Sequence, residues 1–285
     1  MDIIKKAIVF DGQAIVSVID TKEIAQQESD IHGFSTPVAN AMARLLTVGS
    51  FISGNFKNQG DKLTIIISSD GPIEKMVVCG DYGAKVRGYC AVPKALEGFE
   101  NVSVNKVIGK GQLQVIEDLG LKEPYNGLVE LVNGNISSDF AYYFATSEQI
   151  NSAIALGSEF KDGKCLASGG IIIQAMPGCR DEILVILEDI VSQLTDVAKL
   201  FKEKSASEIL DYYFGHFDIQ YMDDIKPKLE CSCSRARFAG ALMTMGKDQV
   251  MSILEQEGKI EAKCDFCQTK YEFNKEELTQ LFEND

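Results

Sequence analysis

The sequence predicts an α+β protein of three parts: a mixed N-terminal domain with an antiparallel sheet and helices over residues 1–178, a helical connector over residues 179–227, and a small C-terminal module over residues 228–285. Short β-branched segments separated by polar turns fill the first part, which is typical of antiparallel sheets. The second part begins with a long stretch that lacks Gly and Pro and carries apolar residues at helical spacing. The third part is too short for a dependable apolar core, but it contains two close pairs of cysteines.

Several strands are expected in the first part, because runs of β-branched residues stop at turn signals such as Ser69-Asp70-Gly71-Pro72 and Pro93. The expected strands are residues 62–68, 75–79, 85–92, 127–132 and 169–176. The first three follow one another with tight polar turns, so we expect an antiparallel meander there. Two helices are also expected. One begins at Thr36 as N-cap with Pro37 in its first turn, and one begins near Ser147 and continues through Ile154.

The connector is expected to be mainly helical. Residues 181–204 have apolar side chains at helical spacing. Ser205 and Glu208 form a capping-box pattern that predicts a second, short helix. Residues 214–225 are aromatic and acidic without a clear period, so we expect them to dock on another part of the protein rather than form a core of their own.

Composition excludes several classes of protein. The 285 residues are 45% hydrophobic and 25% charged, as in ordinary globular proteins. A net charge of −14 makes nucleic acid an improbable partner. No uncharged run approaches the roughly 18 residues that would span a membrane, and the N-terminal residues do not resemble a signal peptide. We therefore expect a cytoplasmic protein without a membrane partner, in a compartment that keeps thiols reduced.

The two cysteine pairs of the C-terminal module predict a zinc site. Cys231-Ser-Cys233 is followed, after thirty residues, by Cys264-Asp-Phe-Cys267. Two close pairs separated by one small structural unit are the pattern of a four-thiolate zinc site, because zinc takes four soft ligands on a tetrahedron. Residues 258–273 fit a hairpin whose tip carries the second pair. Caps at Ser234 and at Asn274 with Glu277 predict helices on either side: Ser234-Arg-Ala-Arg-Phe and Asn274-Lys-Glu-Glu277.

Two uses of such a site stay open on the residues alone. A permanent structural zinc would simply hold a small domain together. The Cys-x-Cys pair instead favours redox chemistry, since a disulfide within it closes a small, strained ring that is easily reduced. Arg235, Arg237 and Lys263 are close to the cysteines in sequence, where positive charge would favour reactive thiolates.

The cysteine pattern, together with Tyr271 and Phe273 behind it, resembles the C-terminal domain of the 33 kDa chaperonin family, the redox-regulated bacterial heat-shock holdases. Other segments resemble the same family, so the similarity extends over nearly the whole chain. They are His32-Gly-Phe-Ser-Thr-Pro37, Val86-Arg-Gly-Tyr89 and Gly169-Gly-Ile-Ile-Ile-Gln-Ala-Met-Pro-Gly178.

The resemblance implies a switch rather than an enzyme. In that family the reduced protein binds one zinc ion and is inactive. Oxidation forms disulfides between neighbours, here Cys231–Cys233 and Cys264–Cys267, and expels the zinc. Unfolding or aggregation-prone client proteins then bind without ATP, and a homodimer is possible, especially in the oxidised form.

The residues also leave other classes of protein open. A constitutive structural-zinc module that binds nucleic acid or protein without redox switching is the main alternative. A thiol oxidoreductase would need a strand-to-helix context around Cys264 that the expected hairpin denies. Only His32 and His216 could serve a hydrolase, and no nucleophile motif accompanies them. The remaining cysteines are most simply small buried apolar residues: Cys79, Cys90, Cys165 and Cys179.

Overall fold

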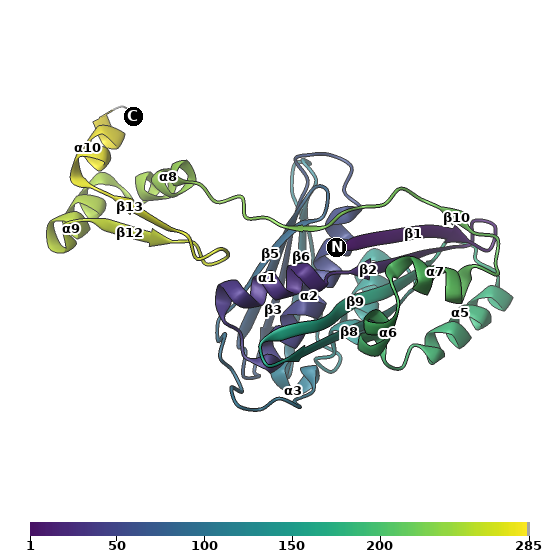
Figure 1. Cartoon of the computed structure of the whole chain (residues 1–285). Helices are drawn as coiled ribbons and strands as arrows, with labels where there is room; N and C mark the ends of the chain where they lie inside the picture. The colour runs from purple at the N-terminus through teal and green to yellow at the C-terminus, as the bar shows by residue number, and fades with distance from the viewer. Residues whose placement is uncertain (284–285) are drawn as a thin grey trace. The chain divides into compact units, whose positions relative to one another are not determined.

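The structure, a computed structural model, describes residues 1–283 and contains two compact units, Met1–Glu230 and Cys231–Asp285 (Figure 1). Each unit is described by itself. Helices of the expected connector belong to the first unit, so the boundary between residues 178 and 179 stays a prediction. Among the described residues, no helix is long and apolar enough to cross a membrane.

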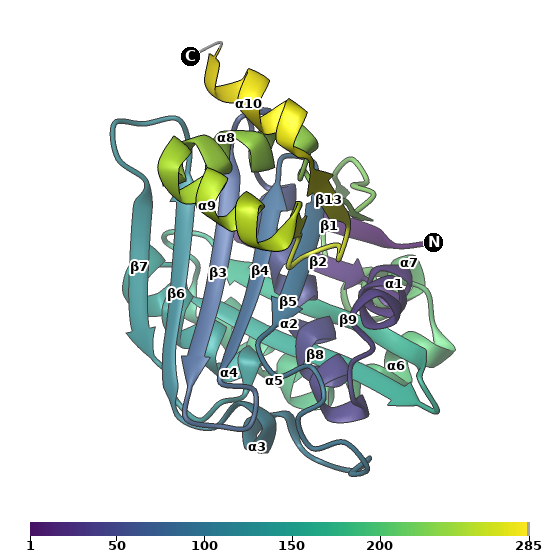
Figure 2. The same cartoon turned by 90° about the vertical axis from the view of Figure 1, so that its left-hand side faces the viewer.

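The first unit is built on two sheets. Its strands are β1 (Ile3–Val9), β2 (Ala14–Asp20), β3 (Lys62–Ser69), β4 (Lys75–Asp81), β5 (Lys85–Cys90), β6 (Gly111–Asp118), β7 (Tyr125–Glu130), β8 (Ser152–Lys161), β9 (Lys164–Ala175), β10 (Gln220–Tyr221) and β11 (Lys228–Leu229). One sheet has the order β10-β1-β2-β9-β8, and the other has the order β11-β5-β4-β3-β6-β7. Neighbouring strands are antiparallel except β11, which runs parallel to β5. Figure 2 shows β7, β6, β3, β4 and β5 side by side.

Helices fill and cover these sheets. They are α1 (Lys22–His32), α2 (Thr36–Gly54), α3 (Val104–Ile108), α4 (Ile136–Tyr143), the π-helical turn η1 (Phe144–Glu148), α5 (Asp181–Gln193), α6 (Val197–Glu203) and α7 (Ala206–Phe214). Nearly every side chain of α2 is buried, and the helix contacts strands of both sheets. It forms the centre of the main core together with side chains such as Leu45 and Ile65.

A second core lies on the other face of the sheet that contains β1, β2, β9 and β8. Val16 and Ile171 of that sheet pack with Leu187 of α5, Phe201 of α6 and Ile209 of α7. Figure 1 shows these three helices along this sheet. The apolar face of the sheet is therefore covered by the helices of residues 181–214.

The expected α+β class is confirmed. The five expected strands coincide with β3, β4, β5, β7 and β9, and β3, β4 and β5 form the meander, whereas β1, β2, β6 and β8 were not predicted. Helix α2 is present, but its N-cap is Ser35 and not Thr36, which is the first helical residue. The capping box at Ser205 and Glu208 is present. The helix expected from Ser147 through Ile154 is wrong. A helix occurs earlier, as α4 capped by Asn135, and Ile154 lies in β8, where it pairs with Ile172. Pairing with a buried strand outweighs the local helical spacing.

Residues 181–204 form two helices rather than one. The first helix, α5, ends at Gln193. The side chain of Asp196 then accepts a hydrogen bond from the Lys199 amide at the start of α6. Asp is a preferred N-cap, so it favours a new start at this point. Residues 214–225 are docked as expected: β10 pairs with β1, and the amide of Ile4 donates to the carbonyl of Ile225.

The second unit contains α8 (Arg235–Met245), α9 (Lys247–Glu257), the hairpin β12 (Ile260–Lys263) and β13 (Lys270–Phe273), and α10 (Lys275–Glu283). Both predicted caps are present, since Ser234 accepts from Arg237 and Asn274 accepts from Glu277. The described buried core of the unit is small. It consists of Leu242, Val250, Leu254, Ile260, Phe273 and Leu278.

Candidate metal centre

Two separate segments bring the four cysteines of the second unit together. Cys231 and Cys233 lie in extended chain just before α8, whereas Cys264 and Cys267 lie in the turn of the β12–β13 hairpin. This turn is closed by backbone bonds, from Cys264 to the Thr269 carbonyl at 2.9 Å and from Gln268 to the Cys264 carbonyl at 2.9 Å. The expected hairpin with the second cysteine pair at its tip is therefore present.

The sulfur atoms form one compact cluster. All four Sγ atoms lie within 4.8 Å of one another. Cys231 Sγ is 3.7 Å from Cys264 Sγ, and Cys233 Sγ is 3.3 Å from Cys267 Sγ. Sulfurs on a regular tetrahedron around zinc, each ~2.3 Å from the metal, are about 3.8 Å apart. Four cysteines at these spacings can hold a metal ion.

The thiols differ electrostatically when no metal is bound. Burial raises the pKa of Cys231 and also that of Cys264. Burial acts in the same direction on Cys267, but hydrogen bonds from Thr269 and Cys233 outweigh it and lower the pKa of Cys267 to about 7. A bound cation would favour the thiolate at every ligand, because the metal charge is the largest in such a site.

Polar side chains form a shell around the sulfurs. The Tyr271 hydroxyl lies 3.2 Å from Cys233 Sγ, and the Tyr271 ring packs on Phe238 with centroids 4.9 Å apart. The hydroxyl of Thr269 is 3.2 Å from Cys267 Sγ. Sequence reasoning gave these two hydroxyls no role, although Tyr271 stood in the family-like pattern. Side chains two residues apart in a strand share a face, so the positions of Cys267, Thr269 and Tyr271 could have indicated that these hydroxyls lie on the side of the sulfurs.

Arg235 and Arg237, two of the three basic residues near the cysteines in sequence, bind partners other than sulfur. The Arg235 guanidinium donates to the Glu277 carboxylate at 2.8 Å and lies over the Phe273 ring. Arg237 donates to Ser232 through both its backbone carbonyl and its hydroxyl. These arginines therefore tie α8 to the rest of the unit, which is a role that their position in the sequence did not indicate.

The other four cysteines are free thiols far from this cluster in the chain. Burial raises the pKa of Cys90 to about 11 and that of Cys165 to about 12. Burial also raises the pKa of Cys79. Thiols with raised pKa values stay protonated at neutral pH and are poor nucleophiles. The expectation of small buried apolar residues is confirmed for Cys90 and Cys165 and is wrong for Cys79 and Cys179, which are only partly buried.

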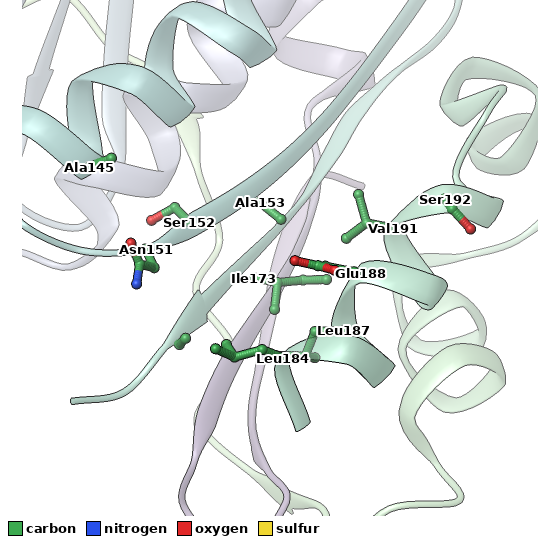
Figure 3. Close-up of a pocket in the computed structure, with 11 residues that line it drawn as sticks. Ala145, Asn151, Ser152, Ala153, Ile173, Leu184, Leu187, Glu188, Val191 and Ser192 are labelled. Carbon is green, nitrogen blue, oxygen red and sulfur yellow. The ribbon is translucent and has the colours of Figure 1, made fainter. Parts of the chain in front are cut away.

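An open cavity lies between α5 and the strands β8 and β9 (Figure 3). Its volume is about 540 Å³, and apolar side chains of the helix and the sheet line most of it. Leu184, Leu187 and Val191 of α5 face Ala153 of β8 and Ile173 of β9 across this space. Missing contacts of this kind weaken the attachment of a helix.

A two-sheet α+β unit followed by a small module organised around four cysteines defines the class of protein. A family model described as Hsp33 protein matches residues 2–274. The 33 kDa chaperonin of Caldanaerobacter subterraneus is 35% identical over 286 residues, covering 98% of this chain and 97% of its own. That of Lachnoclostridium phytofermentans is 36% identical over 287 residues and covers 98% of both chains.

A crystal structure of the 33 kDa chaperonin, heat shock protein 33 homolog, from Thermotoga maritima has the same fold. It is 30% identical, with a TM-score of 0.90 over 99% of this chain and 98% of that chain. The chain belongs to the Hsp33 family, and its family is one of chaperones. The resemblance seen in the sequence is confirmed.

Proposed function

We propose that this protein is a redox-regulated, ATP-independent holdase, not an enzyme. In the reduced state Cys231, Cys233, Cys264 and Cys267 hold one zinc ion, and the chaperone is inactive. A peroxide-class oxidant converts the four thiolates into two disulfides, each giving up two electrons, and the zinc leaves. Unfolding client proteins then bind. The sulfur cluster within a unit that has little core of its own is the observation that carries this proposal.

The energetics support the first step. Structural zinc contributes roughly 10–16 kcal/mol of apparent binding free energy to small zinc-dependent domains. The net stability of a typical domain is about 5–15 kcal/mol. A unit whose core is Leu242, Val250 and a few further side chains has little to replace that contribution. We therefore expect the second unit to unfold when the zinc leaves.

In the second step, unfolding of the second unit loosens the helices of residues 181–214. Residues 220–230 lead from α7 to Cys231 and contact the rest of the first unit through two short strands, a bridge at Ile225 and the ion pairs of Asp224 and Glu230. Helix α5 is docked over the cavity described above. Unfolding of the second unit frees the end of this segment. We expect α5, which packs over a cavity, to be the element of the second core least able to stay docked. Apolar surface of the second core would then be exposed to clients.

The disulfide pairing is a separate part of the proposal. The family resemblance implies the neighbour pairs Cys231–Cys233 and Cys264–Cys267. The shortest sulfur separations given above instead join the first cysteine pair to the second. Digestion of the oxidised protein followed by mass spectrometry distinguishes them, since cross-linked fragments from the two segments would contradict the neighbour pairing.

The test compares reduced and peroxide-treated protein in suppressing aggregation of a thermally unfolding client, with zinc content and free thiols measured in the same samples. We expect suppression only after oxidation, with zinc released and four thiols lost. Cys231→Ser should lose zinc and redox control, whereas Cys179→Ser, outside the cluster, should behave as the parent chain. Equal suppression before and after treatment with zinc retained would instead indicate a constitutive structural-zinc module.

The same proposal includes the setting and the partners. The switch requires a reducing compartment at rest, which fits the bacterial cytoplasm. Clients are unfolding proteins, and a homodimer is proposed for the oxidised form; size-exclusion chromatography in both redox states tests it. The net charge of −14 opposes binding of nucleic acid, and added duplex DNA should not compete with a client.

A further inference from the structure

The outer edge of β5 is occupied by a short segment of the chain itself. The Lys228 amide donates to the Ala84 carbonyl and the Glu230 amide donates to the Val86 carbonyl, both at 3.0 Å. The parallel register of Leu229 with Val86 directs the Val86 amide to the Lys228 carbonyl. Three residues therefore satisfy the polar backbone groups of this edge.

The edge slot has a defined end. The next amide of β5 that faces this edge, after that of Val86, belongs to Gly88. It donates to Glu28 Oε1 of α1 at 2.8 Å. Glu28 is only 1% exposed, and its Oε2 has no hydrogen-bond partner. Its neighbour His32 lies 3.4 Å from Oε1. Helix α1 thus closes the slot, which accepts a short extended segment rather than a long strand.

The side chains of the segment have distinct surroundings. Leu229 packs against the main core, as does Ile225 a few residues earlier. Glu230 points to the other face and forms an ion pair with Lys85 at 2.7 Å. The slot therefore takes an apolar side chain on one face and pairs an acid with Lys85 on the other.

The occupant of the slot ends directly before the first cysteine of the cluster, because Glu230 precedes Cys231. If the second unit unfolds, residues 228–230 are held on β5 by three backbone hydrogen bonds, the packing of Leu229 and one exposed ion pair. An exposed ion pair contributes about 0–1 kcal/mol. The departure of the segment would leave the β5 edge unpaired, and unpaired edges bind other extended chains.

We infer that the edge of β5 over residues 84–88 is a client-binding surface that residues 228–230 cover in the inactive protein. The partner is an extended, unfolded segment with a large apolar residue in the place of Leu229, followed by an acidic residue in the place of Glu230. It pairs parallel to β5 and replaces the same backbone bonds. This inference rests on the proposed function, since it needs the segment to be released by oxidation.

The test uses the oxidised full-length protein and a blocked peptide with the sequence Ile-Lys-Pro-Lys-Leu-Glu, taken from residues 225–230. The matched control is the same peptide N-methylated at the positions of Lys228 and Glu230, which removes the two donors. Hydrogen exchange of residues 84–88 and suppression of client aggregation are measured with each. We expect the unmodified peptide to slow exchange at Val86 and to reduce client suppression at least twofold, and the methylated peptide to do neither.

Three results would overturn the inference while leaving the proposed function intact. In the first, the unmodified and methylated peptides reduce client suppression equally. In the second, a client is bound without any change in hydrogen exchange over residues 84–88. In the third, Val86 is already protected in the oxidised protein alone, by a second copy of the chain. Failure of the proposed function is different, because oxidised protein without peptide would then not suppress aggregation.

A charge reversal gives an independent check. Lys85→Glu alters a half-exposed side chain, so the fold should be retained. In this variant the peptide should compete less well, and a peptide with Lys in place of the final Glu should compete better than the parent peptide. If both peptides act equally on the variant, Lys85 does not help select the partner.

Discussion

Cys233 illustrates how much of a sulfur site lies beyond its ligands. The Tyr271 hydroxyl at 3.2 Å is held by ring packing on Phe238. The hydrogen bond with Cys233 raises the pKa of Tyr271 to about 12, so the phenol stays protonated and can donate to a thiolate. Hydrogen bonds of this kind orient and tune metal ligands.

Tyr271→Phe should therefore weaken zinc binding without unfolding the module. The substitution removes the donor and keeps the ring. Loss of a group that supports a ligand typically costs 10–100-fold in metal affinity. We expect an effect near the lower end, because all four sulfurs are kept and only the hydrogen bond to Cys233 is lost. Competition with a chromophoric chelator measures it. Tyr212→Phe, at an exposed site in the first unit, is the control, and an unchanged zinc affinity in Tyr271→Phe would contradict the argument.

A second residue-scale effect concerns Glu117 at the end of β6. Burial, with the nearby charges of Glu148 and Asp61, raises the pKa of Glu117 to about 7 from 4.5. The folded protein binds this proton more tightly than the unfolded chain. Its contribution to stability is thus complete below about pH 4.5 and is lost as the pH rises through 7.

Glu117→Gln should remove this loss. At pH 5 the variant and the parent chain carry a neutral side chain and should differ little in free energy of unfolding. At pH 8 the parent carries a poorly solvated carboxylate, so the variant should be the more stable of the two. Denaturant titration at both pH values checks the difference, with exposed Glu123→Gln as control. A variant that is destabilised equally at both pH values would refute this account.

At the scale of elements, the sequence predicts those whose local signals agree with their burial. Helix α2 has Pro37 in its first turn and an apolar sequence, and the β12–β13 hairpin is marked by its cysteines. The sequence prediction fails for elements whose secondary structure is determined by a contact between distant parts of the chain. Ile154 becomes strand because β9 pairs with it, and β11 forms because β5 has a free edge. Neither partner is visible in a local window.

Helix α5 offers a way to test whether weak docking sets the threshold of the switch. Ala153 of β8 lines the cavity beneath the helix. Ala153→Val adds two buried carbons in a strand, where Val is favoured, and should stabilise docking by about 1.5 kcal/mol. Leu187→Ala enlarges the cavity and should cost about 2–5 kcal/mol.

The expected results have opposite signs. After identical peroxide treatment, Ala153→Val should bind client more slowly and show slower hydrogen exchange in α5, whereas Leu187→Ala should bind sooner. Zinc release should be the same in both, because the substitutions lie outside the second unit. If client binding follows zinc release equally in all three proteins, docking of α5 is not the controlling step.

The two units differ in how much buried apolar core stabilises them. The first has two cores, one around α2 and one beneath helices α5–α7. The second has the small core around Leu242 and Val250 and the sulfur cluster. The sequence predicted this contrast because cysteine spacing and segment length are local properties. It could not predict the cavity or the arginine partners, which depend on how distant side chains pack.

Metal removal from the reduced protein isolates this contrast, because no disulfide forms. With a chelator and a thiol reductant present, we expect amides of β12 and β13 to lose their protection from hydrogen exchange, while those of β3, at the centre of its sheet, stay protected. Without zinc, the four thiols no longer link the two cysteine segments, and the metal-binding free energy is lost. The unit has few buried apolar side chains that could replace it. Cys267→Ser should reproduce the result without chelator. Persistent protection of β12 and β13 in metal-free protein would show that the second unit folds on its core alone, and a zinc-controlled switch would then lack its driving force.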